Sequence, residues 1–368
     1  MRNLIFFLSV LPLLFTSCIQ STPPDPEADI LTFYFPEGSQ RIKNVEIYNK
    51  YIVAYPKKDV SLQDSAFSLT VTPNATWERI DKYPVNDTLF YIKVTSEDKV
   101  HSKLYAVIQV EDFPEIFDFE NWVKFSSGYL YENPKQSTLQ WYSSNNGTAI
   151  VWLSPGKPAD EYLVRKTNVC VSGDWAAELR SMVGPGKIVS GINIPCLAGS
   201  LYLGGFDVLT GLTDPLKSTK FGIPFNSGKP VKLTGYYLYQ EGTEDYINAD
   251  GTRTPGKRDT CAIYSVIYKT DDNVQYLYGD NIGSSPNVIA RAEVNPTEII
   301  QGNTFVPFEV YFDYDSYTTP FVPEELENNE YKITIVFSTG NRGYYYEGRP
   351  GSRLVIDNVK LYYDVLNY

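Results

Sequence analysis

Carboxylates are the side chains of this sequence with the clearest catalytic potential. Asp313 and Asp315 lie two residues apart in the segment PFEVYFDYDSY, which also contains Glu309, and Asp207 follows a separate apolar run. Glycoside hydrolysis needs two carboxyl groups that flank the scissile bond. Residues i and i+2 of a strand share a face, so Asp313 and Asp315 would lie on the same side of a bound sugar. The sequence therefore permits a hydrolase but identifies no pair of catalytic acids.

Histidine-dependent catalysis is excluded from most of the chain. The single histidine, His101, lies in the segment SEDKVHS, which predicts a solvated turn. The residues after it therefore cannot supply a Ser–His–Asp or Cys–His relay, nor a histidine-based zinc or non-haem iron site. No glycine-rich phosphate-binding motif is present either. Catalysis by carboxylates and ligand binding without catalysis remain as functions that the sequence permits.

Aromatic residues offer a second chemistry, in which rings stack on the apolar faces of sugars. Three consecutive tyrosines, 344–346, cannot all face inward on a strand, so at least one of them is expected at the surface. A single aromatic residue is more often part of a core than of a ligand platform. The residues that we expect at or near a sugar-binding surface are Trp141, Asn145, Tyr237, Tyr239 and Tyr345.

The elements that must position these residues are strands. The 30 Tyr and 19 Phe, scattered among 25 Gly and 24 Pro, suit short strands and turns. Residues 29–112 show about seven short strand patterns, which is typical of an immunoglobulin-like sandwich. Residues 116–368 continue with strands and longer polar loops. We therefore predict an all-β chain of two sandwiches.

Three segments of the larger part make specific predictions. The alternation in PFEVYFDYDSY predicts a strand with an apolar core side and an acidic, aromatic outer side. The segment CAIYSVIYK is apolar on both faces and predicts a central strand. The polar, glycine-punctuated segment 240–259 predicts either a rim over a binding site or a mobile surface loop.

The segments DFENW (118–122) and VIDNVKL (355–361) resemble the first and last strands of galactose-binding-like jelly rolls. In those domains the terminal strands pair and often bind calcium, so the resemblance implies Glu120 and Asp357 as ligands of a structural calcium ion. The alternative is that both carboxylates accept hydrogen bonds from loop amides. The apolar parity changes after Ile356, which predicts a β-bulge at Asp357–Asn358.

The N-terminal segment MRNLIFFLSVLPLLFTSC predicts a secretory lipoprotein signal, residues 1–18, with a lipid attached at Cys18. Phe15 occupies a position where leucine is usual, and a secreted form without lipid is the alternative. Residues 19–28 predict a proline-rich tether. The remaining cysteines are odd in number, which permits at most one disulfide within the chain; we expect Cys170 and Cys261 to be buried free thiols.

The formal net charge of −12 bears on the class of partner. An acidic surface repels phosphates, so nucleic acids and anionic membrane surfaces are disfavoured as ligands. Neutral sugars and cations are tolerated. The predicted contact with a membrane is through the lipid anchor only.

Residues 116–368 resemble a particular family, the putative carbohydrate metabolism domain of Bacteroidetes lipoproteins. The matching segments follow one another along the chain: DFENW, WYSSNNG, VSGDWAAELRS, LAGSLYLGGF, GIPFNSGKPVKLTGYYLYQ, RDTCAIYSVIY, VFSTG and GSRLVIDNVKL. The resemblance implies a jelly-roll sandwich behind an immunoglobulin-like module, in proteins that serve glycan capture or breakdown.

These observations favour a glycan-binding lipoprotein of the outer membrane that takes part in carbohydrate utilisation without catalysis. A polysaccharide or oligosaccharide is the expected ligand, and proteins of glycan uptake are further candidate partners. Two alternatives stay open. The first is a glycoside hydrolase or lyase on the same jelly roll, with a carboxylate such as Asp207, Glu309 or Asp313. The second is an adhesion or scaffold protein that binds another protein.

Overall fold

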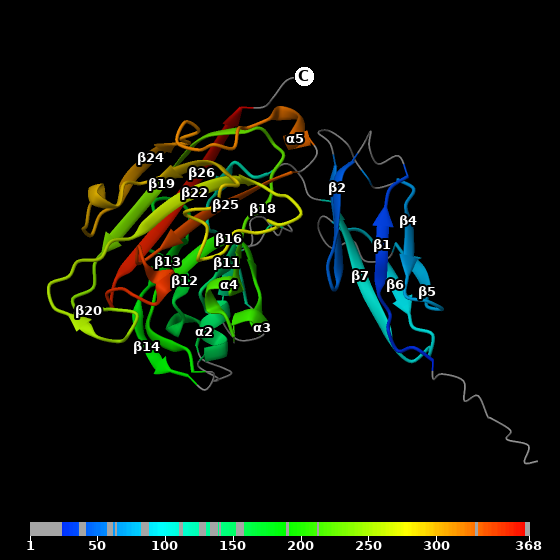
Figure 1. Cartoon of the computed structure of the whole chain (residues 1–368), viewed down its shortest axis with the longest axis horizontal. Coiled ribbons are helices and arrows are strands. Elements are labelled where there is room, and N and C mark those ends of the chain that lie inside the picture. Colours follow the sequence, from blue (N-terminus) through cyan, green and yellow to red (C-terminus); the bar gives the residue numbers. More distant parts are fainter. Residues whose placement is uncertain are drawn as a thin grey trace, which may run out of the picture.

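A computed structural model describes residues 24–36, 42–56, 62, 65–81, 88–109, 113–124, 130–132, 139, 141–151, 158–188, 191–211, 213–327 and 330–364. The predicted signal with Cys18 lies outside these residues, as do residues 19–23 of the tether. The described chain is nearly all β, which confirms the predicted class. Figure 1 shows a smaller unit in blue and cyan and a larger one in green to red.

The smaller unit contains seven strands within the residues that the structure describes. Five form one sheet, in the order β2 (Ile42–Ile47), β3 (Tyr51–Pro56), β7 (Ser102–Gln109), β6 (Thr88–Thr95) and β5 (Thr76–Ile80). The other two, β1 (Ile30–Tyr34) and β4 (Ser68–Val71), pair with each other. Apolar residues of both sheets, among them Phe33, Ile92 and Val107, share one core. His101 lies in the β6–β7 turn and is exposed, with its Nδ1 2.7 Å from Asp98 Oδ2.

The larger unit is a sandwich of two main sheets. One has the order β11 (Trp141–Ser143), β16 (Ser200–Phe206), β25 (Tyr331–Ser338), β22 (Ala262–Lys269) and β23 (Val288–Glu293), with β17 (Thr219–Phe221) on β16 and β18 (Ile223–Pro224) on β25. The other has the order β12 (Val164–Thr167), β13 (Ala176–Arg180), β26 (Arg353–Asp364), β19 (Lys229–Gln240) and β24 (Val306–Tyr311), with β8 (Ile116–Phe117) on β26. The main core lies between these seven- and six-stranded sheets and begins at Phe113.

Short elements complete the larger unit. Three strand pairs are β9 (Trp122–Lys124) with β10 (Leu130–Glu132), β14 (Met182–Lys187) with β15 (Asn193–Leu197), and β20 (Tyr246–Ile247) with β21 (Arg253–Thr254). The helical segments are α2 (Asn145–Val151), α3 (Val208–Gly211), α4 (Pro215–Ser218), α5 (Pro323–Glu327), η2 (Ala159–Glu161), η3 (Pro296–Glu298) and η4 (Gly343–Tyr345). Within the described residues, none of the helices has the length and apolar character needed to span a membrane.

Strand β22 is buried on both faces, as its sequence predicts. Ile263 and Ile267 point into the core between the two main sheets. Tyr264 and Tyr268 point to the other side of the seven-stranded sheet, where they join a second apolar cluster with Tyr202. This sheet therefore carries apolar residues on its outer face as well, and that outer face forms the floor of the pocket described below.

Two predictions at the ends of strands are confirmed. Along β26, Leu354 and Ile356 point into the core and Val359 follows with the opposite parity. The register against β19 shifts between Asp357 and Lys360, and Asn358 has φ +49°, so a bulge lies where the parity change predicts it. Along β24, Phe308 is buried, whereas Glu309 and Tyr311 are exposed.

Segment 240–259 is more than a surface loop. It forms the β20–β21 hairpin, and Tyr246 and Ile247 are buried. Ile247 and Gly348 exchange backbone hydrogen bonds of 2.8 and 3.0 Å. The three described cysteines are free thiols; Cys196 and Cys261 are buried, whereas Cys170 lies half-buried in a loop, so the prediction that its thiol is buried is wrong.

Candidate functional site

A pocket of about 630 Å³ lies on the outer face of the seven-stranded sheet. Its floor consists of two rows of side chains across strands β16, β25 and β22, because the three strands pair in register. One row is Tyr202, Val336 and Tyr264, and the other is Ser200, Ser338 and Ala262. An aromatic and apolar row thus runs beside a row of small residues that carries two hydroxyls.

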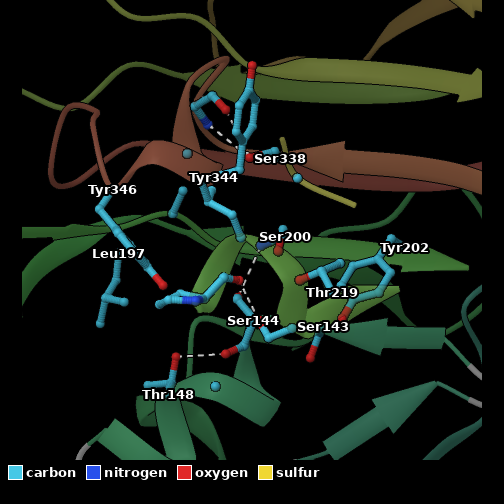
Figure 2. A pocket seen from close by; sticks show the side chains of 18 of the residues that line it. Ser143, Ser144, Thr148, Leu197, Ser200, Tyr202, Thr219, Ser338, Tyr344 and Tyr346 are labelled. Carbon is cyan, nitrogen blue, oxygen red and sulfur yellow. Dashed lines mark hydrogen bonds between the residues drawn. The ribbon is translucent and has the colours of Figure 1, made fainter. Parts of the chain in front are cut away.

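Four segments form the walls of the pocket. They are the start of α2 with the turn before it, the α3–α4 region, the β14–β15 hairpin and the turn at 340–346. Figure 2 shows Tyr346 beside Leu197 on one side, Tyr202 beside Thr219 on the other, and Ser143, Ser144 and Thr148 below them.

Hydroxyl groups line the end of the pocket near α2. Thr148 Oγ1 donates to the carbonyl oxygen of Ser144 at 2.8 Å, and Ser144 Oγ accepts from the backbone N–H of Ser200 at 3.1 Å. A hydroxyl that accepts one bond still has its own hydrogen to donate. Ser144 can therefore donate to a ligand while it stays fixed in place.

Tyrosines 344 and 346 line the mouth of the pocket. Tyr344 is 42% exposed, which agrees with the expectation that one tyrosine of the run is at the surface. Burial raises the pKa of Tyr346 to about 12, so its phenol stays neutral and can donate a hydrogen bond. Two rings and several hydroxyls thus meet at one opening.

Charged groups are scarce in this pocket. Among the described residues that line it, Lys187 is the single charged side chain, and none is a carboxylate. The lining can stack on the apolar face of a ligand and exchange hydrogen bonds with its hydroxyls. It offers no acid and base pair of the kind that glycoside hydrolysis requires.

Ion pairs and hydrogen bonds hold the segment 342–349, which carries the mouth tyrosines. Asp259 Oδ2 accepts the N–H of Arg349 at 3.0 Å, and Glu241 Oε1 accepts from Arg349 Nη1 at 2.9 Å. Glu347 Oε2 accepts from Arg342 Nε at 2.9 Å. Burial raises the pKa of Asp259 to about 6. Asp259 and Glu241 thus hold Arg349, and the Arg342–Glu347 pair closes the turn that carries Tyr344 and Tyr346.

Four of the five residues predicted at the sugar surface lie elsewhere. Trp141, Tyr237 and Tyr239 are buried in the core between the sheets, and Asn145 is also fully buried. Asn145 bonds both the N–H and the carbonyl of Val164, at 2.9 and 2.6 Å, and so ties the start of α2 to β12. Because these side chains do not reach the surface, the prediction that they contact a sugar is wrong.

The fifth residue, Tyr345, lies beside the mouth of the pocket. Its ring is 4.3 Å from that of Tyr344, and it is half-buried. It is not among the residues that line the cavity. Parity did not reveal the floor tyrosines Tyr202 and Tyr264, because their strands are apolar on both faces. They line the pocket with only 2% and 7% of their surface exposed.

The candidate catalytic carboxylates lie apart in separate local structures. The N–H of Thr210 and the ammonium group of Lys220 lower the pKa of Asp207, and Lys232 and Tyr311 lower that of Glu309. Hydrogen bonds from Ser316 lower the pKa of Asp313. A general acid needs a raised pKa to hold its proton near neutral pH. None of the three is among the residues that line the pocket.

Glu120 and Asp357 both accept hydrogen bonds from the loop before β13. The N–H groups of Asp174 and Trp175 lie 3.0 and 3.2 Å from Glu120 Oε1. Those of Val171 and Ser172 lie 2.6 and 3.3 Å from Asp357 Oδ2. Burial raises the pKa of Asp357, and the charge of Glu120 adds to the shift, so the two carboxylates are electrostatically coupled.

These contacts bear on the predicted calcium ion. Amide N–H groups present positive charge to a carboxylate and compete with a cation for the same oxygens. Among the described residues, no three acidic, histidine or cysteine side chains converge to hold a metal. The donor set therefore fits the alternative, hydrogen bonding to loop amides, better than it fits a calcium site.

Fold and pocket together define a class: a two-sheet β-sandwich, preceded by a smaller one, with a tyrosine-lined pocket on an outer sheet face that has no carboxylate among its described lining residues. The chain belongs to the family described as Putative carbohydrate metabolism domain, whose profile matches residues 118–362. This confirms the family resemblance seen in the sequence.

Two solved structures are similar to this chain. One is a putative glycoside hydrolase from Bacteroides thetaiotaomicron, with 29% identity and a TM-score of 0.73 over 94% of this chain and 99% of the other. The second is a putative glycoside hydrolase from Bacteroides vulgatus, with 30% identity and a TM-score of 0.60 over 68% of this chain and 98% of the other. No curated protein matches the chain.

Proposed function

We propose that this protein binds a neutral glycan in the pocket on the seven-stranded sheet and does not cleave it. The observation that carries the proposal is the lining itself, which combines Tyr344 and Tyr346 at the mouth with serine and threonine hydroxyls, over a floor in which Tyr202 and Tyr264 are almost fully covered. Among the described lining residues there is no carboxylate. Sugars present apolar ring faces and uncharged hydroxyls, and this lining complements both. Membership in a carbohydrate metabolism family supports the same ligand class.

The wider setting is part of the proposal. Lipidation at Cys18 would anchor the protein in the outer membrane, and the smaller sandwich would act as a spacer. Metabolic labelling with a radioactive fatty acid is expected to label the unchanged protein and not Cys18→Ala. An unchanged protein that takes up no label would contradict the lipid anchor.

The test of glycan binding is affinity electrophoresis of the full chain through gels that contain single neutral polysaccharides. Tyr344→Ala removes an exposed ring from the mouth, and the expected loss is about 1–2 kcal/mol, or roughly 5- to 30-fold in Kd. Tyr311→Ala is the matched control, because Tyr311 is 60% exposed on the other main sheet. Equal mobility of the two variants and the unchanged protein in every retarding gel would reject the pocket as the site.

A hydrolase is the second candidate, because both similar structures are described as putative glycoside hydrolases. It predicts that oligosaccharides accumulate when the protein is incubated with a polysaccharide, as chromatography would detect. The variants Asp207→Asn, Glu309→Gln and Asp313→Asn would each be compared with the unchanged protein. Product formation that one of these changes abolishes would replace binding by catalysis as the main function.

A further inference from the structure

Three arginines surround one buried glutamate on the outer face of the six-stranded sheet. Glu178 Oε1 accepts from Arg165 Nε and Arg180 Nε, both at 2.7 Å, and Oε2 accepts from Arg353 Nε at 2.6 Å. The side chain of Glu178 is 2% exposed. We call Arg165, Arg180 and Arg353 the arginine cluster.

The strand register forces this arrangement. Arg165 lies directly opposite Glu178 across β12 and β13, and Arg180 lies directly opposite Arg353 across β13 and β26. Like charges that face each other across an antiparallel pair are destabilising. Glu178 neutralises one of the three guanidinium groups, which leaves two positive charges on a chain whose net charge is −12. The stability of the fold alone does not explain why a second and a third arginine lie beside Glu178.

The arginines differ in how much of their hydrogen-bonding capacity is in use. Arg165 also donates through Nη1 to the carbonyl of Asp160, and Arg353 donates through Nη1 to Gln240 Oε1 at 3.3 Å. The side chain of Arg180 is 45% exposed, and with the described residues it makes one hydrogen bond, through Nε. Its two terminal amino groups are therefore the cluster's most accessible donors for an oxyanion.

A hollow of about 480 Å³ adjoins the cluster. Arg165 and Glu178 line it together with Asp160, Lys166 and Trp175. The ammonium group of Lys166 lies 3.6 Å from the centre of the Trp175 ring. Arg180 does not line this hollow and lies five residues from Trp175, roughly 16 Å along the extended chain. An aromatic ring in the hollow and a cationic donor at that spacing would contact different units of one polysaccharide chain.

We infer that the arginine cluster and the Trp175 hollow form a second binding site, one for the carboxylate or sulfate group of an acidic polysaccharide. Arg180 would donate to the oxyanion through its two amino groups, since guanidinium matches planar and tetrahedral oxyanions in a fork geometry. The ring that packs at Trp175 would belong to another sugar unit of the same polysaccharide, because Arg180 does not line the hollow. This site lies on the sheet opposite the neutral pocket, so it does not rest on the proposed function.

Nucleic acid is the competing anionic ligand. A polyphosphate carries one charge for every nucleotide and would meet the repulsion of the whole acidic chain. An acidic polysaccharide carries a similar charge per unit, and the carbohydrate description of the family favours it over nucleic acid. Acidic polysaccharide is therefore the ligand to which the proposal commits.

The test is binding of the full chain to polygalacturonate and to chondroitin sulfate at 50 mM and 500 mM salt, with dextran and a single-stranded oligonucleotide as further arms. Polygalacturonate carries only carboxylates, so the two acidic arms distinguish carboxylate from sulfate. We expect at least one acidic polysaccharide to bind at 50 mM salt and to bind at least fivefold more weakly at 500 mM salt.

Arg180→Gln is the informative variant and Arg253→Gln is its control, because Arg253 is also 45% exposed and lies on β21 with Glu244 as its partner. Arg180→Gln is expected to weaken acidic binding at least fivefold and Arg253→Gln less than twofold, with melting temperatures unchanged. Lys166→Gln serves as a second variant if Arg180→Gln fails to fold. No acidic binding at 50 mM salt, equal effects of the two arginine variants, or equal binding of the oligonucleotide would each overturn the proposal.

Discussion

At the scale of one residue, the side chain of Trp141 packs in the core and not at a sugar-binding surface. Its ring contacts Phe117, Phe119 and Phe337 with centroid distances of 5.2, 5.6 and 5.8 Å. The indole N–H is buried and has no hydrogen-bond partner among the described residues. A buried donor without a partner destabilises the folded protein, so the indole N–H does not explain why tryptophan occupies this position.

We predict that Trp141→Phe changes the free energy of unfolding by less than about 1 kcal/mol, because removal of the N–H offsets the smaller ring. Trp141→Ala should lose about 3–5 kcal/mol, because it leaves a cavity. Urea denaturation of both variants measures the difference. Equal losses would mean that the indole N–H has a partner, such as a buried water.

The titration of Asp259 makes the stability of the folded protein depend on pH in a direction that can be predicted. Its pKa is about 6 in the folded protein and 3.8 in the reference state, so the folded state holds the proton more tightly. This group's contribution to stability therefore falls as the pH rises from about 4 to 6. Asp259→Asn does not titrate and should remove that fall, which amounts to about 1–3 kcal/mol.

The measurement is the free energy of unfolding of the unchanged protein and of Asp259→Asn at pH 4.5 and pH 7. The variant should lose stability at both values, because an amide oxygen cannot accept all the backbone N–H bonds that the carboxylate accepts. The relative loss should be larger at pH 4.5. A loss of the same size at both pH values would show that Asp259 titrates normally.

The loop before β13 wraps around the carboxylates of Glu120 and Asp357, and the absence of a side chain at Gly173 lets the loop backbone approach Glu120 closely. Its φ is +73°, and a Cβ atom there would lie 1.9 Å from Glu120 Oε1. Gly256 has a similar φ, +74°, but a Cβ atom would meet nothing within 4 Å. Replacement of Gly256 by alanine therefore measures the cost of the left-handed backbone conformation alone. Replacement of Gly173 adds the cost of the clash with Glu120.

We predict that Gly256→Ala costs about 1 kcal/mol, as expected for a left-handed position, and that Gly173→Ala costs at least twice as much. Thermal denaturation with calcium or with a chelator tests the metal at the same time. We expect a melting temperature that does not depend on calcium, because loop amides bond both carboxylates. A rise with calcium would restore Glu120 and Asp357 as metal ligands.

Element type and strand parity were predictable from the sequence, but accessibility was not. The bulge at Asp357–Asn358 and the two faces of β24 follow from alternation within one strand. Tyr237 and Leu238 show the limit: they point to opposite faces of β19, and both are buried. Tyr237 faces the other sheet, whereas Leu238 packs with Ala176 and Val355 in a small outer cluster. Which faces are covered depends on contacts between distant segments, and these leave no local pattern.

At the scale of the whole molecule, the two proposed sites differ in electrostatic character. The neutral pocket has Lys187 as its one charged lining residue among the described residues, whereas the arginine cluster carries a local excess of positive charge. Salt screens charge interactions but does not weaken stacking or uncharged hydrogen bonds.

We therefore predict that affinity for a neutral glycan changes less than twofold between 50 mM and 500 mM salt, although the protein carries a net charge of −12. Isothermal titration of the full chain at the two salt concentrations is the measurement, with an acidic polysaccharide as the comparison. A neutral ligand that lost affinity in parallel with the acidic one would place both at the charged face.

The four wall segments of the neutral pocket have a consequence for stoichiometry. A cavity enclosed by α2, the α3–α4 region, the β14–β15 hairpin and the 340–346 turn admits a terminus more easily than the middle of a long chain. The number of protein molecules bound per polysaccharide would then depend on the number of its chain ends and not on its length. A branched polymer would saturate at a higher ratio than a linear polymer of equal mass, and cutting a linear chain in two would double the capacity without altering the affinity.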